Sequence, residues 1–436
     1  MFKVRNIEFG EGIPKIAVPV IAESEEEICE VVREAGTAGD LIELRADAFS
    51  GIYDTMRLLS LLSDVRELTD RPVLFTLRSK REGGLLDVHP EEYLDILRIA
   101  ISSGSIDLID IELGALPTEE AEEYGISTAQ MLTEESHGFG IRVVMSQHNF
   151  ASTPRRADIY EALKTMRDLG ADIAKGAYMP ETYEDVDEVL AAGMKADKNL
   201  SIPFILISMG EMGQMTRTHG EVFGSAVTFA CLGGKASAPG QFEADELAQI
   251  LTEIHERRKE SGMIFLIGFM GAGKSTVGAA LSNLCDCDII EMDEEIEAEQ
   301  GTPISAIFEN KGEQYFRDLE TDFIASLSEE SGGIVSCGGG AVLRARNVIL
   351  MKGLGKVVLL TAEPETVYER LLHEADMRPV LAGRFTVEGI RSLGNARMDY
   401  YNEAQDFTVA TDGKTAEDIA GEILALLQWR INRPQT

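Results

Sequence analysis

A glycine-rich segment in the second half of the chain has the composition of a phosphate-binding loop. Residues 268–275 read GFMGAGKS, a complete GxxxxGKS, and they follow an apolar run that begins at Met263. Glycines at this spacing let backbone N–H groups surround phosphate oxygens, while Lys274 neutralises the β and γ oxygens and the Ser275 hydroxyl ligates Mg²⁺. The motif therefore predicts nucleotide binding, but it leaves the phosphoryl acceptor open. The expected ATP contacts are Gly268, Gly271, Ala272, Gly273, Lys274, Ser275 and Thr276.

A lysine and a histidine stand in two apolar segments of the first half. Lys175 interrupts the run DIAKGAY, and His148 lies near the end of the preceding run, IRVVMSQHN. Lysine in a buried strand is costly unless it is neutral or paired. A lysine whose pKa is lowered by burial and nearby cations can attack a ketone and form an imine. A histidine beside it can transfer protons near neutral pH. Taken singly, Lys175 could be a strand-end lysine that reaches solvent, and His148 a hydrogen-bonded core histidine.

Further polar residues stand where other apolar runs of this half end. They are Glu43, Arg45, Arg78, Glu82, Arg217, Ser237 and Gln241. Arg45 and Arg78 could simply form salt bridges with Glu43 and Glu82. The convergence of one lysine, one histidine and three arginines at a shared rim instead favours a site for an anionic carbonyl compound.

The elements that must position these residues follow a repeating pattern. Eight short apolar runs alternate with amphipathic segments whose apolar residues recur at i, i+3 and i+4. The runs begin at Ile16, Leu41, Val73, Asp107, Ile141, Asp172, Pro203 and Ser225. Near-continuous apolar strands alternating with helices indicate a parallel sheet buried on both faces. Eight units in about 250 residues predict a closed (β/α)8 TIM barrel over residues 1–256, with catalysis at the carboxyl ends of its strands. An open doubly wound sheet is the alternative. A P-loop α/β domain with a parallel sheet is expected over residues 262–436.

Composition limits the classes of partner. The chain has 436 residues, of which 44% are hydrophobic, and a formal net charge of −35, which argues against nucleic acid or an anionic membrane as a partner. The sequence has no apolar segment of membrane-spanning length. Its first 15 residues have no apolar core and no small-residue cleavage site, so we do not expect them to be a signal peptide. Cys285 and Cys287 have no second metal-spaced pair, so we expect reduced thiols in a cytoplasmic protein.

Several motifs of the first half resemble, in order, those of type I 3-dehydroquinate dehydratases. They are ELRAD, TLRSKREGG, SQHNF, DIAKGAYMP, SMGEMGQMTR and KASAPGQF, and the resemblance covers residues 14–250. It implies that Lys175 forms a Schiff base with the C3 ketone of 3-dehydroquinate, without a cofactor, and that His148 moves the protons while Glu82 orients it. Arg217 would hold the substrate carboxylate bidentately. The ring hydroxyls would be positioned by Glu43, Arg45, Arg78, Ser237 and Gln241. A homodimer through the barrel is compatible with this resemblance.

One position departs from this pattern. Pro19 stands where many relatives carry serine, so we expect one hydroxyl contact to be absent or to come from the backbone.

The motifs that follow the phosphate-binding loop resemble those of shikimate kinases. They are EMDEEIE, GEQYFRDLE, CGGGAV, MRPVL and ARMDYYNEA, and the resemblance covers residues 263–430. It implies that Asp293 binds the hydroxyl to be phosphorylated and could act as its base. Arg317 and Arg397 would clamp the shikimate carboxylate, and Arg378 would stabilise the moving phosphoryl group. The ring would be bordered by Phe316, Gly338, Gly339 and Gly340.

Other interpretations of this half stay open. Arg317 could only form an ion pair on a helix surface with Asp318 or Glu320, and Arg397 could be a surface residue. Glu291 stands where relatives usually have an aspartate near the metal, and we expect Mg²⁺ dependence to survive the longer side chain. Arg370 is a candidate for stacking on adenine.

Together the resemblances favour a bifunctional enzyme of the shikimate pathway. It would dehydrate 3-dehydroquinate and phosphorylate shikimate with ATP. One alternative is a class I aldolase-like barrel fused to another small-metabolite kinase, which leaves Arg217, Arg317 and Arg397 unexplained as carboxylate partners. Another is a regulatory nucleotide-binding module with a degenerate barrel.

Overall fold

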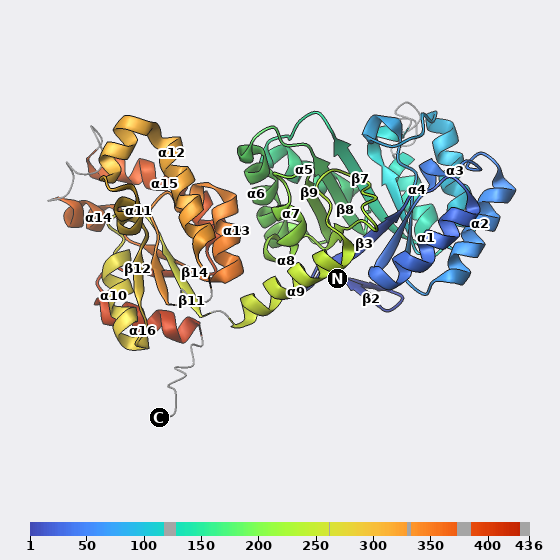
Figure 1. The fold of residues 1–436 in the computed structure, drawn as a ribbon. Coiled ribbons are helices and arrows are strands. Elements are labelled where there is room, and N and C mark those ends of the chain that lie inside the picture. The colour runs from blue at the N-terminus through green and yellow to red at the C-terminus, as the bar shows by residue number, and fades with distance from the viewer. Residues whose placement is uncertain (117–127, 261, 329–332, 373–384, 428–436) are drawn as a thin grey trace, which may run out of the picture. The chain divides into compact units, whose positions relative to one another are not determined.

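The computed structural model describes residues 1–116, 128–260, 262–328, 333–372 and 385–427 (Figure 1). The chain divides into two compact units, Met1–His255 and Glu256–Thr436. None of the helices in the described ranges combines the length and the apolarity that a membrane-spanning segment requires.

The first unit is a nearly closed barrel of eight parallel strands. They are β3 (Lys15–Val20), β4 (Leu41–Arg45), β5 (Val73–Thr76), β6 (Leu108–Glu112), β7 (Arg142–Asn149), β8 (Ile173–Tyr178), β9 (Phe204–Ser208) and β10 (Val227–Phe229). Each strand pairs with the next from β3 to β9, and β10 pairs back with β3. A parallel bridge between Phe204 and Ser225 joins the remaining edges. The predicted (β/α)8 barrel is confirmed, and the open-sheet alternative is wrong.

Helices surround this barrel on its outside (Figure 1). They are α1 (Glu25–Ala38), α2 (Thr55–Leu68), α3 (Pro90–Ser102), α4 (Thr128–Gly138), α5 (Arg156–Asp168), α6 (Tyr183–Asn199), α7 (Met215–Thr218), α8 (Gly220–Phe223) and α9 (Ala244–Glu260). Their buried faces follow the predicted spacing; α1, for example, buries Ile28, Val32 and Ala35.

An N-terminal hairpin covers one end of the barrel. Its strands are β1 (Phe2–Val4) and β2 (Ile7–Phe9), which pair antiparallel. Val4, Ile7 and Phe9 are buried in one cluster with residues such as Leu41 and Leu108, which begin their strands. This end is therefore filled with apolar side chains, and the polar residues lie at the other end. The hairpin was not among the elements predicted from the sequence.

The second unit is built on a five-stranded parallel sheet. Its order is β12 (Ile289–Glu291), β13 (Ile334–Ser336), β11 (Met263–Ile267), β14 (Gly355–Thr361) and β15 (Phe407–Ala410). The helices are α10 (Lys274–Cys285), α11 (Met292–Gln300), α12 (Ile304–Ser326), α13 (Ala345–Leu354), α14 (Pro364–Leu371), α15 (Val387–Ala404) and α16 (Ala416–Leu426). Leu281 of α10 and Ile423 of α16 pack with Leu266 of β11 in one core. The predicted P-loop domain with a parallel sheet is confirmed.

Candidate active sites

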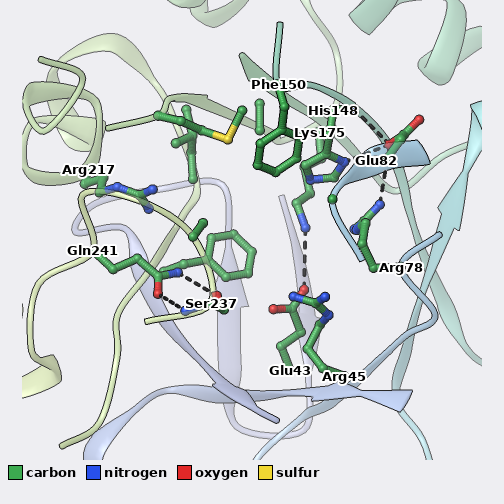
Figure 2. Close-up of a pocket in the computed structure, with 16 residues that line it drawn as sticks. Glu43, Arg45, Arg78, Glu82, His148, Phe150, Lys175, Arg217, Ser237 and Gln241 are labelled. Carbon is green, nitrogen blue, oxygen red and sulfur yellow. Dashed lines mark hydrogen bonds and ion pairs between the residues drawn. The ribbon is translucent and has the colours of Figure 1, made fainter. Parts of the chain in front are cut away.

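One pocket in the barrel collects all nine residues that the sequence predicted for the first site (Figure 2). They are Glu43, Arg45, Arg78, Glu82, His148, Lys175, Arg217, Ser237 and Gln241. Apolar residues that were not predicted also line the pocket, among them Phe150, Ile207, Met209 and Phe229. Eight of the nine lie on the strands or in the turns and loops that follow them, and Arg217 lies on the short helix α7. Lys175 and His148 lie on adjacent strands, where Ala177 pairs with His148.

 The labels in Figure 2 mark nine predicted side chains, and the tenth label is Phe150, which the sequence analysis did not single out.

Lys175 is held from several sides inside the barrel. It lies on β8 with a side chain that is 5% exposed, and its Nζ is 3.2 Å from Asp110 Oδ2 and 3.6 Å from Glu43 Oε1. The ring of Phe229 on β10 lies 4.6 Å from the same nitrogen. The lysine is therefore buried and paired with carboxylates, and its amine points into the pocket (Figure 2).

Arg78 is the centre of an ionic network behind the pocket. Its Nη2 donates to Asp110 Oδ2 (2.8 Å), and its Nη1 donates to Glu112 Oε1 (3.1 Å) and to Ser146 Oγ (3.0 Å). Glu82 lies 3.6 Å from Nη1, so the predicted salt bridge forms, but it is the longest of these contacts. Sequence reasoning missed Asp110 and Glu112. The signal for them was a pair of carboxylates at i and i+2 inside the otherwise apolar strand β6.

Arg45 hydrogen-bonds to Asp47 and not to Glu43 or Glu82, the two glutamates that the sequence suggested as salt-bridge partners. Its Nε and Nη2 donate to the two oxygens of Asp47, each at 2.8 Å. Asp47 lies in the 3₁₀ turn Ala46–Ala48, directly after β4. This turn brings the Asp47 carboxylate into a two-point contact with the guanidinium, which is a strong geometry for an arginine–carboxylate pair.

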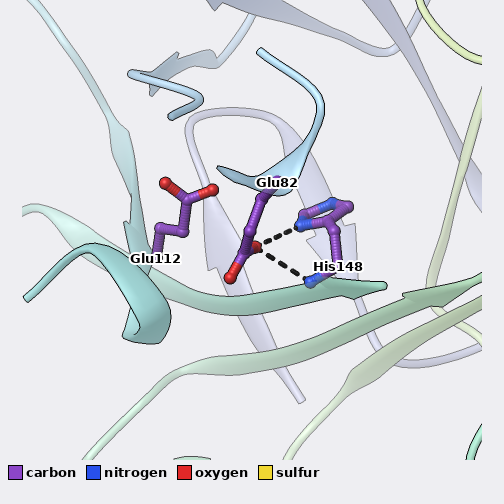
Figure 3. A group of neighbouring side chains, drawn as sticks. All are labelled: Glu82, Glu112 and His148. Carbon is purple, nitrogen blue, oxygen red and sulfur yellow. Dashed lines mark hydrogen bonds and ion pairs between the residues drawn. The ribbon is translucent and has the colours of Figure 1, made fainter. Parts of the chain in front are cut away.

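His148 and Glu82 form a hydrogen-bonded pair (Figure 3). Glu82 Oε2 accepts from the His148 backbone N–H and contacts Nδ1, both at 2.9 Å. Burial, reinforced by the charges of Arg78, Lys175 and Arg45, lowers the pKa of His148 well below its ordinary value. The imidazole is therefore neutral at neutral pH, and the Glu82 contact to Nδ1 leaves Nε2 as the nitrogen for proton transfer.

Glu82 also faces a second carboxyl group, that of Glu112 (Figure 3). Burial and then the Glu112 charge raise the pKa of Glu82 to about 9, against the opposing charge of Arg78. Two carboxyl groups this close share a proton more readily than isolated ones. The positive charge at this cluster comes from Arg78, which contacts both glutamates.

Arg217 differs from the other arginines of the pocket in its partners. It lies on α7, is 1% exposed, and donates from Nη2 to the Pro239 carbonyl at 3.0 Å. Within the described ranges it makes no ion pair, and its Nε has no hydrogen-bond partner. Burial lowers the pKa of Arg217 to about 10. Because an unpaired buried charge is costly, this guanidinium is suited to receive an anion.

Ser237 and Gln241 close the rim beside Arg217 (Figure 2). The Gln241 amide donates to Ser237 Oγ and accepts from the Ser237 backbone N–H, both at 2.8 Å. The loop that carries them therefore presents an ordered hydroxyl and amide to the pocket.

The phosphate-binding loop connects β11 to α10 in the second unit. Its glycines Gly268, Gly271 and Gly273 have φ values of +144°, +75° and +98°, which other residues rarely adopt. Lys274 Nζ donates to the carbonyls of Gly268 (3.0 Å) and Phe269. The loop follows the central strand of the sheet, as the predicted phosphate site requires. Ala272 is buried at the base of this loop, and Thr276 lies exposed in the first turn of α10.

Two oxygen donors suited to Mg²⁺ meet at the start of α10. Ser275 Oγ donates to Glu291 Oε2 at 3.0 Å, and Glu291 ends β12. Hydroxyl and carboxylate oxygens are the ligands that Mg²⁺ prefers, so these residues fit the ion. Glu291 thus lies beside the hydroxyl that the sequence assigned to Mg²⁺.

The three glycines after β13 lie against both predicted arginines. A Cβ at Gly340 would overlap the guanidinium of Arg317, and one at Gly338 would lie 2.7 Å from Glu320 Oε1 and 2.8 Å from Asp293 Oδ1. Gly339 is close to the phosphate-binding loop, since a Cβ there would be 3.6 Å from the Gly268 carbonyl oxygen.

Arg317 is buried in an ionic cluster. Its Nη1 donates to Glu320 (2.7 Å) and its Nη2 to Glu313 (2.9 Å). Burial raises the pKa of Glu320 to about 7, although Arg317 opposes the shift. The ion pair with Glu320 that the sequence allowed does form, but Arg317 is buried and not on a helix surface, and Asp318 pairs with Arg344 instead. Phe316 is buried beside it, with its ring 5.0 Å from that of Phe308.

Arg397 approaches the same glycines from α15. Its Nη1 donates to the Gly339 carbonyl at 3.3 Å, and Tyr401 donates to that carbonyl at 2.6 Å.

Arg370 donates to the Gly271 carbonyl (3.0 Å) and to Thr411 Oγ1 (3.1 Å), which ties the phosphate-binding loop to the end of β15. Arg378 lies outside the described residues.

Fold and sites thus define a TIM barrel with a buried lysine–histidine centre, followed by a P-loop kinase domain. The family profile of type I 3-dehydroquinase matches residues 16–258, and that of shikimate kinase matches residues 270–428. The chain therefore belongs to the type I 3-dehydroquinase family, and its C-terminal domain is of the shikimate kinase family.

Individual proteins are similar to one or the other part of this chain. A 3-dehydroquinate dehydratase of Clostridium kluyveri is 39% identical over 260 residues, which cover 59% of this chain and 98% of that protein. The crystal structure of a Clostridium difficile type I 3-dehydroquinate dehydratase is 34% identical, with a TM-score of 0.54 over 58% of this chain and 97% of that one. An Acinetobacter baumannii shikimate kinase, solved with shikimate, is 34% identical over 40% of this chain and 96% of that one, with a TM-score of 0.37.

Proposed function

We propose that this chain is a bifunctional enzyme. Its barrel converts 3-dehydroquinate to 3-dehydroshikimate and water, and its second domain transfers the γ-phosphoryl group of ATP to shikimate. The observation that carries the proposal is the pocket in which Lys175, His148 and Arg217 meet, because an amine, a neutral base and an unpaired guanidinium match a carboxylated ketone. Membership of the two families supports both halves.

The dehydration would run through a Schiff base without a cofactor. The Lys175 amine attacks the C3 carbonyl, water leaves, and a protonated imine acidifies the hydrogen on C2. The neutral imidazole of His148 removes that proton and later returns it to the C1 hydroxyl, which leaves as water. Hydrolysis of the product imine then restores the lysine. Glu82 keeps the imidazole in place through Nδ1.

Substrate orientation would follow from the charges at the rim. Arg217 is assigned to the carboxylate, because a bidentate contact would supply the partner that its buried guanidinium lacks among the described residues. Ring hydroxyls would contact Glu43, Arg45, Arg78, Ser237 and Gln241. Pro19 lies on β3, where it can offer only its backbone carbonyl.

Phosphoryl transfer would take place between the phosphate-binding loop and the glycines 338–340. Arg317 and Arg397 would hold the shikimate carboxylate, and Asp293 would accept the proton of the attacking hydroxyl. Mg²⁺, held by Ser275 and Glu291, would neutralise charge on the nucleotide phosphates.

Further assignments complete this nucleotide site. Arg378, which lies outside the described residues, is still expected to stabilise the moving phosphoryl group. Gly268, Gly271, Ala272, Gly273, Lys274 and Thr276 are assigned to ATP.

The alternatives fit less well. An aldolase-like barrel joined to another metabolite kinase would match neither family, and a degenerate barrel would have no need for a buried lysine beside a neutral histidine.

Both activities should be measured on one purified chain. Lys175→Ala is expected to abolish dehydration and leave the kinase intact, because the chemistry depends on the amine, and Lys274→Ala is expected to do the reverse. Trapping with borohydride in the presence of 3-dehydroquinate should attach one substrate to Lys175. If either substitution removes both activities from folded protein, the two sites are not independent, and gluconate accepted in place of shikimate would favour another kinase.

Two further properties belong to this proposal. We place the enzyme in the cytoplasm, and we expect a homodimer through the barrel. Light scattering on the purified chain measures the mass in solution, and a monomer at all concentrations would contradict the dimer.

A further inference from the structure

Asp110 occupies a position behind the reactive lysine. It lies on β6, is 1% exposed, and is not among the residues that line the pocket. Its Oδ2 is 3.2 Å from Lys175 Nζ and 2.8 Å from Arg78 Nη2, and its Oδ1 accepts from Ser146 Oγ at 2.5 Å. Three donors from three other barrel positions therefore converge on one buried carboxylate.

These contacts keep Asp110 ionised. Burial on its own opposes ionisation, but Arg78, Lys175 and the Ser146 hydroxyl together hold the pKa of Asp110 below its ordinary value. A negative charge is thus fixed beside Nζ before any substrate arrives, on a rigid strand and away from solvent.

We propose that Asp110 is the counterion of the positively charged Schiff-base nitrogen. The inference rests on the proposed dehydratase function and extends it to a residue with no role assigned so far. Because Asp110 lies within 3.2 Å of the nitrogen that carries the reaction, we regard it as catalytic rather than as scaffolding.

The charge on Nζ changes at each step of the proposed reaction, so a counterion would stabilise some of the intermediates more than others. When Nζ attacks C3 and water leaves, the protonated imine carries one positive charge. Removal of the C2 proton by His148 sends the C–H electron pair into the C2–C3 bond and leaves a neutral enamine. Loss of the C1 hydroxyl as water, with a proton from His148, forms the C1–C2 double bond and restores the positive nitrogen. Asp110 stabilises both charged states.

Arg78 lets the same carboxylate tolerate the neutral step. In the enamine the charge on Nζ is gone, but Asp110 still faces Arg78 at 2.8 Å and Ser146 at 2.5 Å. The buried carboxylate is therefore never without a partner, and the cost of the neutral intermediate is limited.

Glu43 is the competing candidate for the counterion. It lies 3.6 Å from Nζ, accepts from Thr76 Oγ1 at 3.1 Å, and lines the pocket, where substrate hydroxyls would contact it. Asp110 is closer to Nζ and, unlike Glu43, does not line the pocket. The Phe229 ring also lies against Nζ, but it carries no charge.

Asp110→Asn and Glu43→Gln form a matched pair for the test, since each replaces a carboxylate near Nζ by an amide of the same shape. We expect Asp110→Asn to lower kcat for dehydration by roughly 10²- to 10³-fold, the cost of losing one preorganised charge partner, with KM changed less than about threefold. The fraction of enzyme trapped by borohydride during turnover should fall with it. Asp110→Glu should restore part of kcat. Glu43→Gln should act mainly on KM.

Each outcome then decides one question. Wild-type protein without a trapped adduct at Lys175 would refute the dehydratase proposal itself. A normal wild-type adduct together with an Asp110→Asn variant that keeps its kcat within about threefold would refute only the counterion. The same holds if Glu43→Gln, and not Asp110→Asn, lowers kcat and the trapped fraction.

A second variant covers the case in which Asp110→Asn does not fold, as judged by thermal unfolding of the barrel. Ser146→Ala removes one hydrogen bond from the Asp110 carboxylate and leaves its charge. We expect roughly a tenfold lower kcat at unchanged KM, in the range of one hydrogen bond to a charged group. An unchanged kcat in folded Ser146→Ala protein, with Asp110→Asn unfolded, would count against the counterion.

Discussion

Gly340→Ala offers a sharp test of the proposed shikimate site, because the three atoms nearest to the added methyl group all belong to Arg317. The backbone at Gly340 has φ −109° and ψ −4°, which alanine adopts without strain. The new Cβ, however, would overlap the guanidinium of Arg317. The substitution therefore acts on the arginine and not on the turn.

The expected magnitude follows from how Arg317 is held. Carbon atoms in contact need roughly 3.5 to 4.0 Å, so the guanidinium must move by on the order of 1 Å. Its bonds to Glu320 and Glu313, at 2.7 and 2.9 Å, oppose that movement. Misplacing one charge-assisted contact to a carboxylate costs about 2 to 3 kcal/mol. We therefore expect KM for shikimate to rise about 30- to 150-fold.

The assay is steady-state kinase activity at saturating ATP with shikimate varied. Gly339→Ala is the matched variant, since its Cβ would meet nothing closer than 3.6 Å, and we expect a smaller effect from it. Dehydratase activity of the same preparation serves as the control for folding and concentration. A KM for shikimate within about threefold of wild type, or equal effects of the two alanines, would show that Arg317 does not hold the substrate at this place.

Two predictions concern the barrel. Burial and then the charges of Arg78, Lys175 and Arg45 lower the pKa of His148 well below 6.5, so the imidazole stays a neutral base as the pH falls through 6.5. The acidic limb of the pH profile of kcat/KM for dehydration should therefore lie below pH 6.5. A limb at or above pH 6.5 would contradict the assignment of His148 as the base. Arg217→Lys should raise KM for 3-dehydroquinate about 30- to 100-fold, because an ammonium group cannot make the bidentate contact. KM is measured by the absorbance of the product, and an unchanged value would show that Arg217 does not bind the substrate carboxylate.

The sequence carried most of the barrel, because its eight strands are buried on both faces and read as apolar runs. The last of them is predicted from Ser225 and observed from Val227, which is the usual uncertainty at an element boundary. The N-terminal hairpin escaped prediction because three-residue strands give too short a pattern, and Val4, Ile7 and Phe9 become core residues only through the barrel above them.

The ion pairs within the candidate site were harder to predict from the sequence than the site residues themselves. Lys175 and His148 stand out as polar residues in apolar strands, whereas Asp110 and Glu112 belong to a run that also reads as a buried strand. Which carboxylate meets which cation depends on strand register and on the turns after the strands, and a single sequence does not specify either. Arg45 shows this, since its partner Asp47 comes from a 3₁₀ turn.

The balance of charge separates the arginines that hold structure from those that can receive a substrate. In the barrel pocket Arg45 and Arg78 are already neutralised by carboxylates, and Arg217 is the one whose described surroundings contain no ion pair. A substrate carboxylate therefore gains most by contacting Arg217.

In the kinase domain a substrate carboxylate would have to displace a glutamate that already pairs with the arginine. Arg317 is matched by Glu320, which is fully buried, and by Glu313, whose side chain is 59% exposed. An exposed ion pair contributes little and its glutamate can return to water, whereas a buried one cannot. A shikimate carboxylate would therefore replace Glu313 on Nη2 while Glu320 keeps the guanidinium in place. In a chain of net charge −35, both proposed sites would thus have a cation for an anionic substrate. Among the described residues Arg217 has no ion-pair partner, and Arg317 has an exposed partner, Glu313, that a substrate carboxylate could displace.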